Sequence, residues 1–594
     1  MINLLLTLWR LTVCPTCAPA PTIGYTLRLD RTHLDVVDVE MQLRGAPDTF
    51  HLAMRVHAEY DARYWRYVED LRVEQTADDG RATIAREDST LWRVTLPGGR
   101  GVIRYRIHVQ PPEPNTRRAW MPYVRADGAS INGPDFFLYL PGFPTAPVTL
   151  QLRVPDGWRV ATAFPGRGSV AMLLDSPILA GRLREWSFSD RGTRYHVVYW
   201  PLPAAAAFDT TAFVAELQGL TRAALDVFGS APTSEYYFLV QDGADDALEH
   251  RGSVTIGVSS SNLARDPHAS LTEIGHEFFH SWNLVAIHPL GYNALDYRPP
   301  RRTPSLWFGE GVTLHYADVL ARRAGLIDST PTRLEHLASL LSRYYGSPAI
   351  QRVSPARASL AFEDSPVTNP DATGGYYIQG ELLGEVIDAR IRSATNEQRS
   401  LDDVLRAMYA RSRAPKDSGY TAQDLETVAD SVCGCDLSAL FAEQVRSTGP
   451  IDLTPVLSRL GLLLVVDTIP AADAAGQPIP DQRLHIDFAG AHAPAPLYVA
   501  ISNPATAWAR AGLRTGDELV AINGTPIRAF SDFQTALRAL RIGDRASVEL
   551  RRGGAPLTIT VPVSGYTRSR ARLIDAPNVT AEQRSHREAW MRGH

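Results

Sequence analysis

The sequence has very little lysine and no excess of positive charge. Among its 60 basic residues Lys416 is the only lysine, and 65 acidic residues give a net charge of −5. A protein that binds nucleic acid usually shows a basic domain or stripe. The composition therefore predicts that nucleic acid is not a partner, while its 44% hydrophobic and 21% charged residues are typical of an ordinary globular protein.

Cysteine is also scarce, and the four that occur form two close pairs, Cys14 with Cys17 and Cys433 with Cys435. They are too few and too local for a disulfide framework. The C-x-x-C at Cys14 has no second pair that would complete a zinc knuckle, and no strand-helix pattern around it indicates a redox site. We therefore assign these cysteines no function.

The start of the chain has no apolar run long enough to span a membrane. Residues 1–22 contain an apolar run from Leu4 to Trp9 followed by small residues, which is the outline of a secretory leader, although no basic residue precedes the run and Arg10 interrupts it. We predict a leader over residues 1–22 and a periplasmic or secreted protein, with a cytoplasmic protein as the alternative. No membrane span is expected.

At 594 residues the chain is too long for a single hydrophobic core. Residues 23–200 alternate between apolar and polar positions, as in Val37 to Leu43 and Ile103 to Val109, and this predicts an N-terminal antiparallel β domain. Residues 201–450 combine two strands with several helical stretches. We therefore expect a multidomain α+β protein whose middle unit has a helical body.

A last small domain is expected over residues 451–566. Residues 467–496, which are rich in Ala, Pro, Gly and Asp, interrupt it as an insertion. A tail over residues 567–594 contains the capping box Thr580-x-x-Gln583. This pattern predicts a short surface helix near the end of the chain.

Two histidines four residues apart are the strongest chemical signal. His276 and His280 lie in the segment HEFFH, inside an apolar-periodic stretch that predicts a helix from Leu271 to Val285. Residues i and i+4 share one face of a helix, so both imidazoles can bind one zinc ion. Glu277, between them, would lie beside the open coordination position where water binds. The spacing predicts one zinc ion with an activated water.

A hydrolytic zinc site needs a third protein ligand. Glu310, in the segment LWFGEG, stands 30 positions after His280 at the start of another helical stretch and would complete the set. Glu277 would take the proton of the water and pass it to the leaving amine. Asp318, on the same predicted helix as Glu310, either orients a ligand or lies on a solvated face.

Hydrolysis of an amide also needs a donor for the oxyanion that forms when water attacks the carbonyl. Tyr376 and Tyr377, in the segment GGYYIQG, lie at the mouth of a predicted helix. Either phenol could supply the donor, or both rings could pack as buried aromatic residues usually do. The residues alone leave this choice open.

These segments resemble the glycyl aminopeptidase family of gluzincin metallopeptidases. The resemblance rests on four segments, which follow one another in the family's order as LEHRGS, HEFFHSWN, LWFGEG and YYIQG. It also rests on a PDZ-like stretch near the end. It implies a thermolysin-like catalytic domain between an N-terminal β domain and a C-terminal PDZ domain. It also implies that Tyr377 supports the oxyanion and that the zinc ligands are His276, His280 and Glu310.

The resemblance further implies that Glu249, on a strand edge over the site, holds the free α-amine of a peptide substrate. His250 beside it would orient that carboxylate or merely pack. The sequence departs from the family at two places. Asp246-Ala247 replaces a glycine pair, which could change the N-terminal residue that fits or, with Asp245, attract a basic one. Gln379 replaces a lysine and so changes the charge near the tyrosines.

The stretch from Asn503 to Gly524 resembles the core of PDZ domains, which bind an extended peptide as an added strand and grip its terminal carboxylate with a loop. Arg459 to Leu462 is the candidate loop, and Ser531 to Leu540 is the candidate helix of the groove. A peptide ligand is therefore one expected partner. The alternative is that the groove packs against the catalytic unit.

We predict a zinc metallo-aminopeptidase that removes small, glycyl-type residues from the amino termini of peptides. One alternative is an endopeptidase on the same site, for which Glu249 would be dispensable. Another is a peptide-binding adaptor that acts through its PDZ domain and has a vestigial zinc site. The intact base at Glu277 argues against the adaptor, because a dead site has no chemical need for it.

Overall fold

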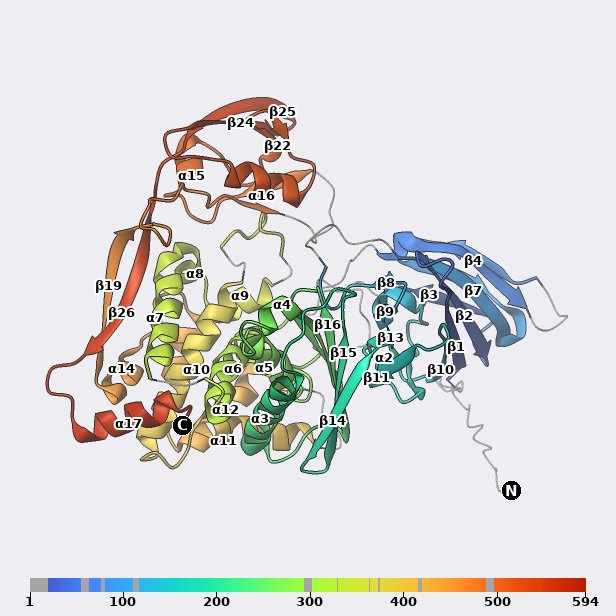
Figure 1. Ribbon diagram of the computed structural model, residues 1–594, viewed down its shortest axis with the longest axis horizontal. Helices are drawn as coiled ribbons and strands as arrows, with labels where there is room; N and C mark the ends of the chain where they lie inside the picture. Colours follow the sequence, from blue (N-terminus) through green and yellow to red (C-terminus); the bar gives the residue numbers. More distant parts are fainter. Residues whose placement is uncertain are drawn as a thin grey trace, which may run out of the picture.

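The fold is described from a computed structural model, shown in Figure 1. It describes residues 20–54, 64–75, 81–109, 117–292, 302–327, 330–362, 364–371, 374–414, 419–487 and 496–594. Most of the predicted leader, with Cys14 and Cys17, lies outside these residues. Within them, no helix has the length and apolar character that a membrane crossing requires.

The N-terminal domain, on the right of Figure 1, is built from β-strands as predicted. Alternation drives the pairing: in β2 (Val36–Arg44) the apolar positions are buried while the polar positions between them are not. The largest sheet has the order β12-β10-β1-β2-β7-β4. It is not wholly antiparallel, because β1 (Thr22–Leu29) runs parallel to β10 (Pro147–Arg153). The remaining strands are β4 (Val68–Gln75), β7 (Arg100–His108) and β12 (Arg167–Ser169).

Two smaller sheets complete this domain. One has the order β3-β6-β5, with β3 (Thr49–Ala53), β5 (Thr83–Arg86) and β6 (Leu91–Thr95). The other has the order β11-β13-β9-β8, with strands β8 (Tyr123–Arg125), β9 (Gly128–Ile131), β11 (Arg159–Thr162) and β13 (Ile178–Gly181). A short helix, α2 (Val170–Leu174), lies where this domain approaches the next one.

The catalytic unit begins earlier than the expected residue 201. Strands β14 (Arg184–Asp190) and β15 (Thr193–Trp200) pair with the strands of the middle unit, in the order β14-β15-β16-β18-β17. In this sheet β15, β16 (Glu235–Asp242) and β18 (Ser253–Val258) are parallel, and β17 (Ala247–His250) forms an antiparallel edge. Local alternation could not assign β14 and β15 to one domain or the other, because their partners lie later in the chain.

Helices pack on this sheet and form the helical body at the centre of Figure 1. Helix α5 (Leu271–Phe279) lays Phe278 against Tyr236 and Phe238 of β16, with ring centroids 5.1 and 5.3 Å apart. The predicted helix over 271–285 thus ends six residues early. The other long helices are α3 (Thr210–Phe228), α6 (Val312–Arg323), α7 (Thr330–Gly346), α10 (Gly375–Ala394), α11 (Leu401–Ser412) and α12 (Ala422–Cys433).

The C-terminal region differs from the expected division. Strands β19 (Leu462–Pro470) and β26 (Thr567–Asp575) pair with each other as a two-stranded arm along α7, visible at the left of Figure 1. The PDZ sheet lies between them, in the order β20-β21-β22-β24-β25. Its strands are β20 (His485–Asp487), β21 (Leu497–Ala500), β22 (Glu518–Ile522), β24 (Arg545–Arg552) and β25 (Ala555–Pro562), with helices α15 (Ala507–Ala511) and α16 (Phe530–Arg538).

The loop that we assigned to the PDZ groove belongs to the catalytic unit instead. Arg459 is buried at the end of α14 (Thr454–Leu460), where it is paired with Glu397, and Leu460 and Leu462 join the core of the helical body. The segment therefore cannot bind a peptide carboxylate in the groove. A Gly-Leu pattern alone does not reveal which sheet follows it.

After the arm, the chain returns to the helical body as α17 (Ala581–Met591). The predicted capping box forms, because Thr580 and Gln583 exchange side chain to backbone hydrogen bonds of 2.9 and 3.1 Å. The helix lies on the surface as predicted, with its other side chains exposed or half-buried, while Trp590 anchors it by packing into the core of the catalytic unit. Separately, Cys433 and Cys435 form a disulfide at the end of α12, a pairing to which the sequence analysis assigned no function.

Candidate active site

The two histidines converge at the end of α5. The Nε2 atoms of His276 and His280 are 3.0 Å apart, and both rings are buried. The Nδ1–H group of His280 donates a hydrogen bond of 2.8 Å to the carbonyl oxygen of Asn283. Because Nδ1 carries the proton, Nε2 presents a lone pair, which is the form in which an imidazole binds a metal.

Glu310 reaches the same point from a second element. It lies in a π-helical turn, Trp307–Gly311, that leads into α6, and such turns are frequent at functional sites. Its Oε2 atom is 3.4 Å from His276 Nε2 and 3.2 Å from His280 Nε2. Candidate ligand atoms of these three residues all lie within 4.8 Å of one another. Two imidazole nitrogens and one carboxylate are a donor set that fits hydrolytic zinc.

The electrostatics of this cluster favour positive charge. Burial disfavours the charged form of Glu310, yet the facing His280 and His276 rings hold its pKa well below its ordinary value. Burial likewise opposes protonation of His280, but the Glu310 carboxylate outweighs it and raises the His280 pKa to about 10. A buried carboxylate between two imidazoles therefore attracts a proton or a metal cation.

Asn283 links the two ligand segments, a role that no spacing or motif in the sequence indicates. Its side-chain amide donates to the carbonyl oxygen of Phe308 at 2.8 Å and to Thr313 Oγ1 at 3.1 Å. Thr313 in turn donates to the carbonyl oxygen of Gly309 at 2.7 Å. These hydrogen bonds require the chain to turn after His280. Leu284, just beyond Asn283, has a positive φ of 118° at this turn. The same turn explains why α5 ends at Phe279.

Two further carboxylates point at the metal position. Glu277 Oε1 lies 3.8 Å from His276 Nε2. Glu249, on the edge strand β17, groups with Glu277 and His280 through candidate ligand atoms within 4.8 Å of one another. Burial raises the pKa of Glu249, opposed by His280 and reinforced by the Glu310 carboxylate. Strand β17 and helix α5 thus bring the predicted amine-binding residue and the predicted base together beside His280.

The adjacent tyrosines occupy different environments. Tyr376 is 5% exposed and packs in the core, whereas Tyr377 is half-buried and its ring centroid lies 6.5 Å from that of His276. A close helix contact fixes this position: a Cβ atom on Gly380 would lie 2.0 Å from the Trp307 carbonyl oxygen, and one on Gly311 2.4 Å from the Gly380 Cα. Only glycine permits α10 to approach the turn that carries Glu310 so closely.

The two departures from the family pattern have structural explanations. The Asp246 carboxylate pairs with Arg118 of the N-terminal domain, so an arginine of another domain partly compensates this charge. Gln379 is buried, and its amide donates to the carbonyl oxygens of Ile350 and Val353 at 2.8 and 2.7 Å. Its amide therefore binds the end of α8 (Pro348–Arg352).

Asp318 has a role other than the two considered for it, whereas His250 takes the packing alternative. Asp318 is buried and forms a bidentate pair with Arg322 at 2.9 Å, so it neither orients a zinc ligand nor lies on a solvated face. His250 is buried with its Nδ1 atom 3.8 Å from Asp175 of the N-terminal domain. It thus packs at the domain boundary behind Glu249.

Comparisons with known proteins agree with this geometry. Residues 270–383 match the family model of the M61 glycyl aminopeptidase, residues 24–182 the M61 N-terminal domain, and residues 484–563 a PDZ domain. No curated protein matches the chain in sequence.

Solved structures are similar at low identity. An aminopeptidase N family protein from Idiomarina loihiensis is 19% identical with a TM-score of 0.74, covering 96% of this chain and 100% of that chain. An M1 zinc metallopeptidase from Deinococcus radiodurans is 16% identical with a TM-score of 0.45, covering 73% of this chain and 96% of that one. The first of these shows that the three-part fold is shared.

Proposed function

We propose that this peptidase, whose residues 270–383 match the family model of the M61 glycyl aminopeptidase, removes single residues from the free amino termini of peptides. His276, His280 and Glu310 would hold one zinc ion, because the two convergent groups of donors share His280 and so describe a single site. A bound zinc ion lowers the pKa of its water and polarises the carbonyl that is attacked.

The residues of this chain divide the remaining work. Glu277 accepts the proton of the attacking water and delivers it to the leaving amine. Tyr377, held by the Gly380 contact, donates its phenol hydrogen to the oxyanion. The edge strand β17 offers its backbone to an extended peptide. Glu249 on that strand pairs with the α-ammonium and positions the first peptide bond at the metal.

The observation that carries the proposal is the number of carboxylates around one point. Glu249, Glu277 and Glu310 together bring three negative charges when ionised, whereas one zinc ion brings two positive charges. The buried site then has one negative charge in excess, and an unpaired buried charge is costly. The ammonium group of a free amino terminus compensates it, but an internal or acetylated peptide bond has no such group.

Matched peptides with free and acetylated amino termini test this proposal. We expect the protein to release the first residue of the free peptides and to leave the acetylated set intact. Glu249→Gln should raise KM for free peptides and reduce the preference for them, while metal content stays at one zinc per chain. Equal cleavage of both sets would contradict the aminopeptidase proposal and support an endopeptidase.

The PDZ domain supports a second binding function on the same chain. Strand β20 lies at the edge of the PDZ sheet, and its Ile486 shares the PDZ core with Phe533 and Leu537 of α16; such domains bind a peptide strand along an edge strand of this kind. The loop Arg459 to Leu462 lies in the catalytic unit, so residues 481–484, which precede β20, become the candidate carboxylate-binding loop. Gln482 in this segment donates to the Leu537 carbonyl oxygen of α16 at 2.8 Å. A C-terminal peptide library with amidated controls would test carboxylate recognition.

We also propose that the protein acts outside the cytoplasm. The leader predicted over residues 1–22 and the Cys433–Cys435 disulfide both fit an oxidising compartment, in which disulfides persist. Cell fractionation with determination of the mature amino terminus tests this. A reduced, uncleaved protein in the cytoplasm would contradict it.

A further inference from the structure

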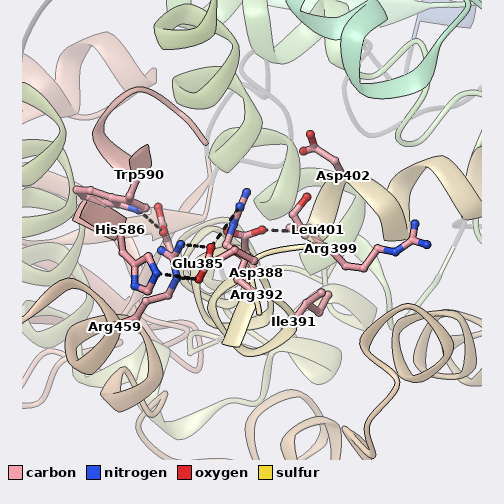
Figure 2. A network of polar contacts seen from close by, with 12 residues as sticks. Glu385, Asp388, Ile391, Arg392, Arg399, Leu401, Asp402, Arg459, His586 and Trp590 are labelled. Atoms are coloured by element: carbon pink, nitrogen blue, oxygen red, sulfur yellow. Dashed lines mark hydrogen bonds and ion pairs between the residues drawn. The ribbon is translucent and has the colours of Figure 1, made fainter. Parts of the chain in front are cut away.

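The last helix of the chain ends against the active-site helices. Trp590 of α17 is buried, and its indole Nε1 donates to Glu385 Oε2 at 2.8 Å, as Figure 2 shows. Glu385 lies on α10, eight residues after Tyr377. A helix that follows the PDZ domain in sequence therefore contacts the helix that carries the proposed oxyanion donor.

Glu385 also joins α10 to α6 and α7. Its Oε1 atom lies 3.3 Å from His315 Nδ1 and 3.0 Å from Arg333 Nη2. His315 lies on α6, five residues after Glu310. One carboxylate thus connects the helix that follows the third zinc ligand, the helix that carries Tyr377 and the C-terminal helix.

Trp590 completes the surroundings of two buried charges. The guanidinium carbon of Arg333 lies 4.3 Å from the Trp590 ring centroid, and Arg333 Nη1 donates to the Trp590 carbonyl oxygen at 2.6 Å. Both Glu385 and Arg333 are buried. A buried charge that loses a partner reorients or draws in water. The orientation of the Glu385 carboxylate therefore depends on the indole.

The contact between α6 and α10 is continuous from this point to the active site. It begins where Gly380 meets Gly311, next to Glu310. One turn further, a Cβ atom on Gly384 would lie 3.1 Å from His315 Cγ. The Glu385 to His315 ion pair follows directly. Because the contact between α6 and α10 leaves so little free space, a shift of Glu385 moves these two helices relative to each other.

We propose that α17 is a positioning element of the active site, in which Trp590, acting through Glu385, holds α6 against α10 and so keeps Glu310 and Tyr377 at their working separation. The proposal rests on the aminopeptidase function argued above. Trp590 contacts Glu385 and Arg333, not substrate or metal ligands, and is a positioning residue.

Trp590→Phe in the full-length, zinc-loaded protein tests this proposal, since it keeps a ring and removes the indole N–H. Loss of an outer-shell partner of a metal ligand costs about 10- to 100-fold, and Trp590 is more remote. We expect kcat to fall about 3- to 10-fold with KM within twofold, and zinc loss to a chelator to quicken by a similar factor.

The matched control is Trp508→Phe in the PDZ core, where a fully buried indole donates to the Asp481 carbonyl oxygen at 2.9 Å. We expect the control to lower Tm as Trp590→Phe does, but to leave kcat and zinc release unchanged. Equal changes in both variants, an unchanged kcat in Trp590→Phe, or a rise in KM alone would each overturn the proposal.

Glu385→Gln supplies a second variant should Trp590→Phe fail to fold, and it should quicken zinc release in the same way. The zinc-release measurement needs no substrate. If the wild-type protein failed to cleave free peptides, the proposed function would fall, yet the release rates would still decide whether α17 positions the ligands.

Discussion

Glu310 and Glu385 are two buried glutamates near opposite ends of the contact between α6 and α10, and both are 8% exposed. Burial opposes ionisation of each, and in each neighbouring groups lower the pKa below its ordinary value. Glu385 is compensated by Arg333, His315 and Trp590. Among the described residues, the ion-pair partners of Glu310 are two imidazoles and no arginine.

The difference shows how one protein distinguishes a structural carboxylate from a metal-binding one. Arginine is always charged and satisfies a buried carboxylate permanently. An imidazole that binds a metal is neutral and presents a lone pair, so a carboxylate between two such rings still needs the charge of a proton or a metal cation. The choice of partner, rather than the depth of burial, decides which glutamate binds metal.

The largest effect on activity is expected at Glu277, the water-activating residue beside Glu310. Glu277→Gln removes the proton acceptor but keeps the shape of the side chain. We expect kcat to fall by about 10²- to 10⁴-fold with zinc content unchanged, measured by peptide hydrolysis and metal analysis. Retained turnover would exclude Glu277 as the base.

Replacing each of the two carboxylates in turn tests directly whether only Glu310 binds the metal. Glu310→Gln should weaken zinc binding by more than the roughly 100-fold that loss of an outer-shell partner costs. Glu385→Gln should weaken it far less. Competition with a chelator of known affinity measures both, and similar losses in the two variants would show that the two sites are not distinct in kind.

The link between the ligand segments gives an intermediate effect. Asn283→Ala leaves the buried carbonyl oxygen of Phe308 and the Thr313 hydroxyl without this donor. We expect a loss of about 1–3 kcal/mol in the free energy of unfolding and weaker zinc binding. Denaturant unfolding of the metal-free protein measures the loss of stability separately from the loss of zinc binding. Asn262→Ala, at an exposed position in a short helix, serves as a control.

The smallest effect concerns the pH dependence of stability. Because the pKa of Glu385 is lowered on folding, its contribution is present above its ordinary pKa near 4.5 and is lost as pH falls below that value. Glu385→Gln should therefore be less stable than the wild type at pH 7, with a difference that narrows toward pH 3. Unfolding curves of metal-free proteins at several pH values measure this, and a difference that is constant with pH would argue against it.

The sequence by itself determined what depends on local geometry. The helical period of four residues brings His276 and His280 together, and the PDZ core and the Thr580 capping box were likewise readable because their contacts lie close along the chain. Alternation in β2 and β7 identified the N-terminal strands in the same way.

Only the tertiary structure decided the contacts between distant segments. The pairing of β19 with β26, the Arg118 partner of Asp246, the Asn283 link and the burial of Trp590 each join residues from different elements. Their side chains follow no periodic pattern, and their partners are selected by packing around a shared core. For this reason the metal ligands could be predicted from spacing, whereas the arrangement that positions them could not.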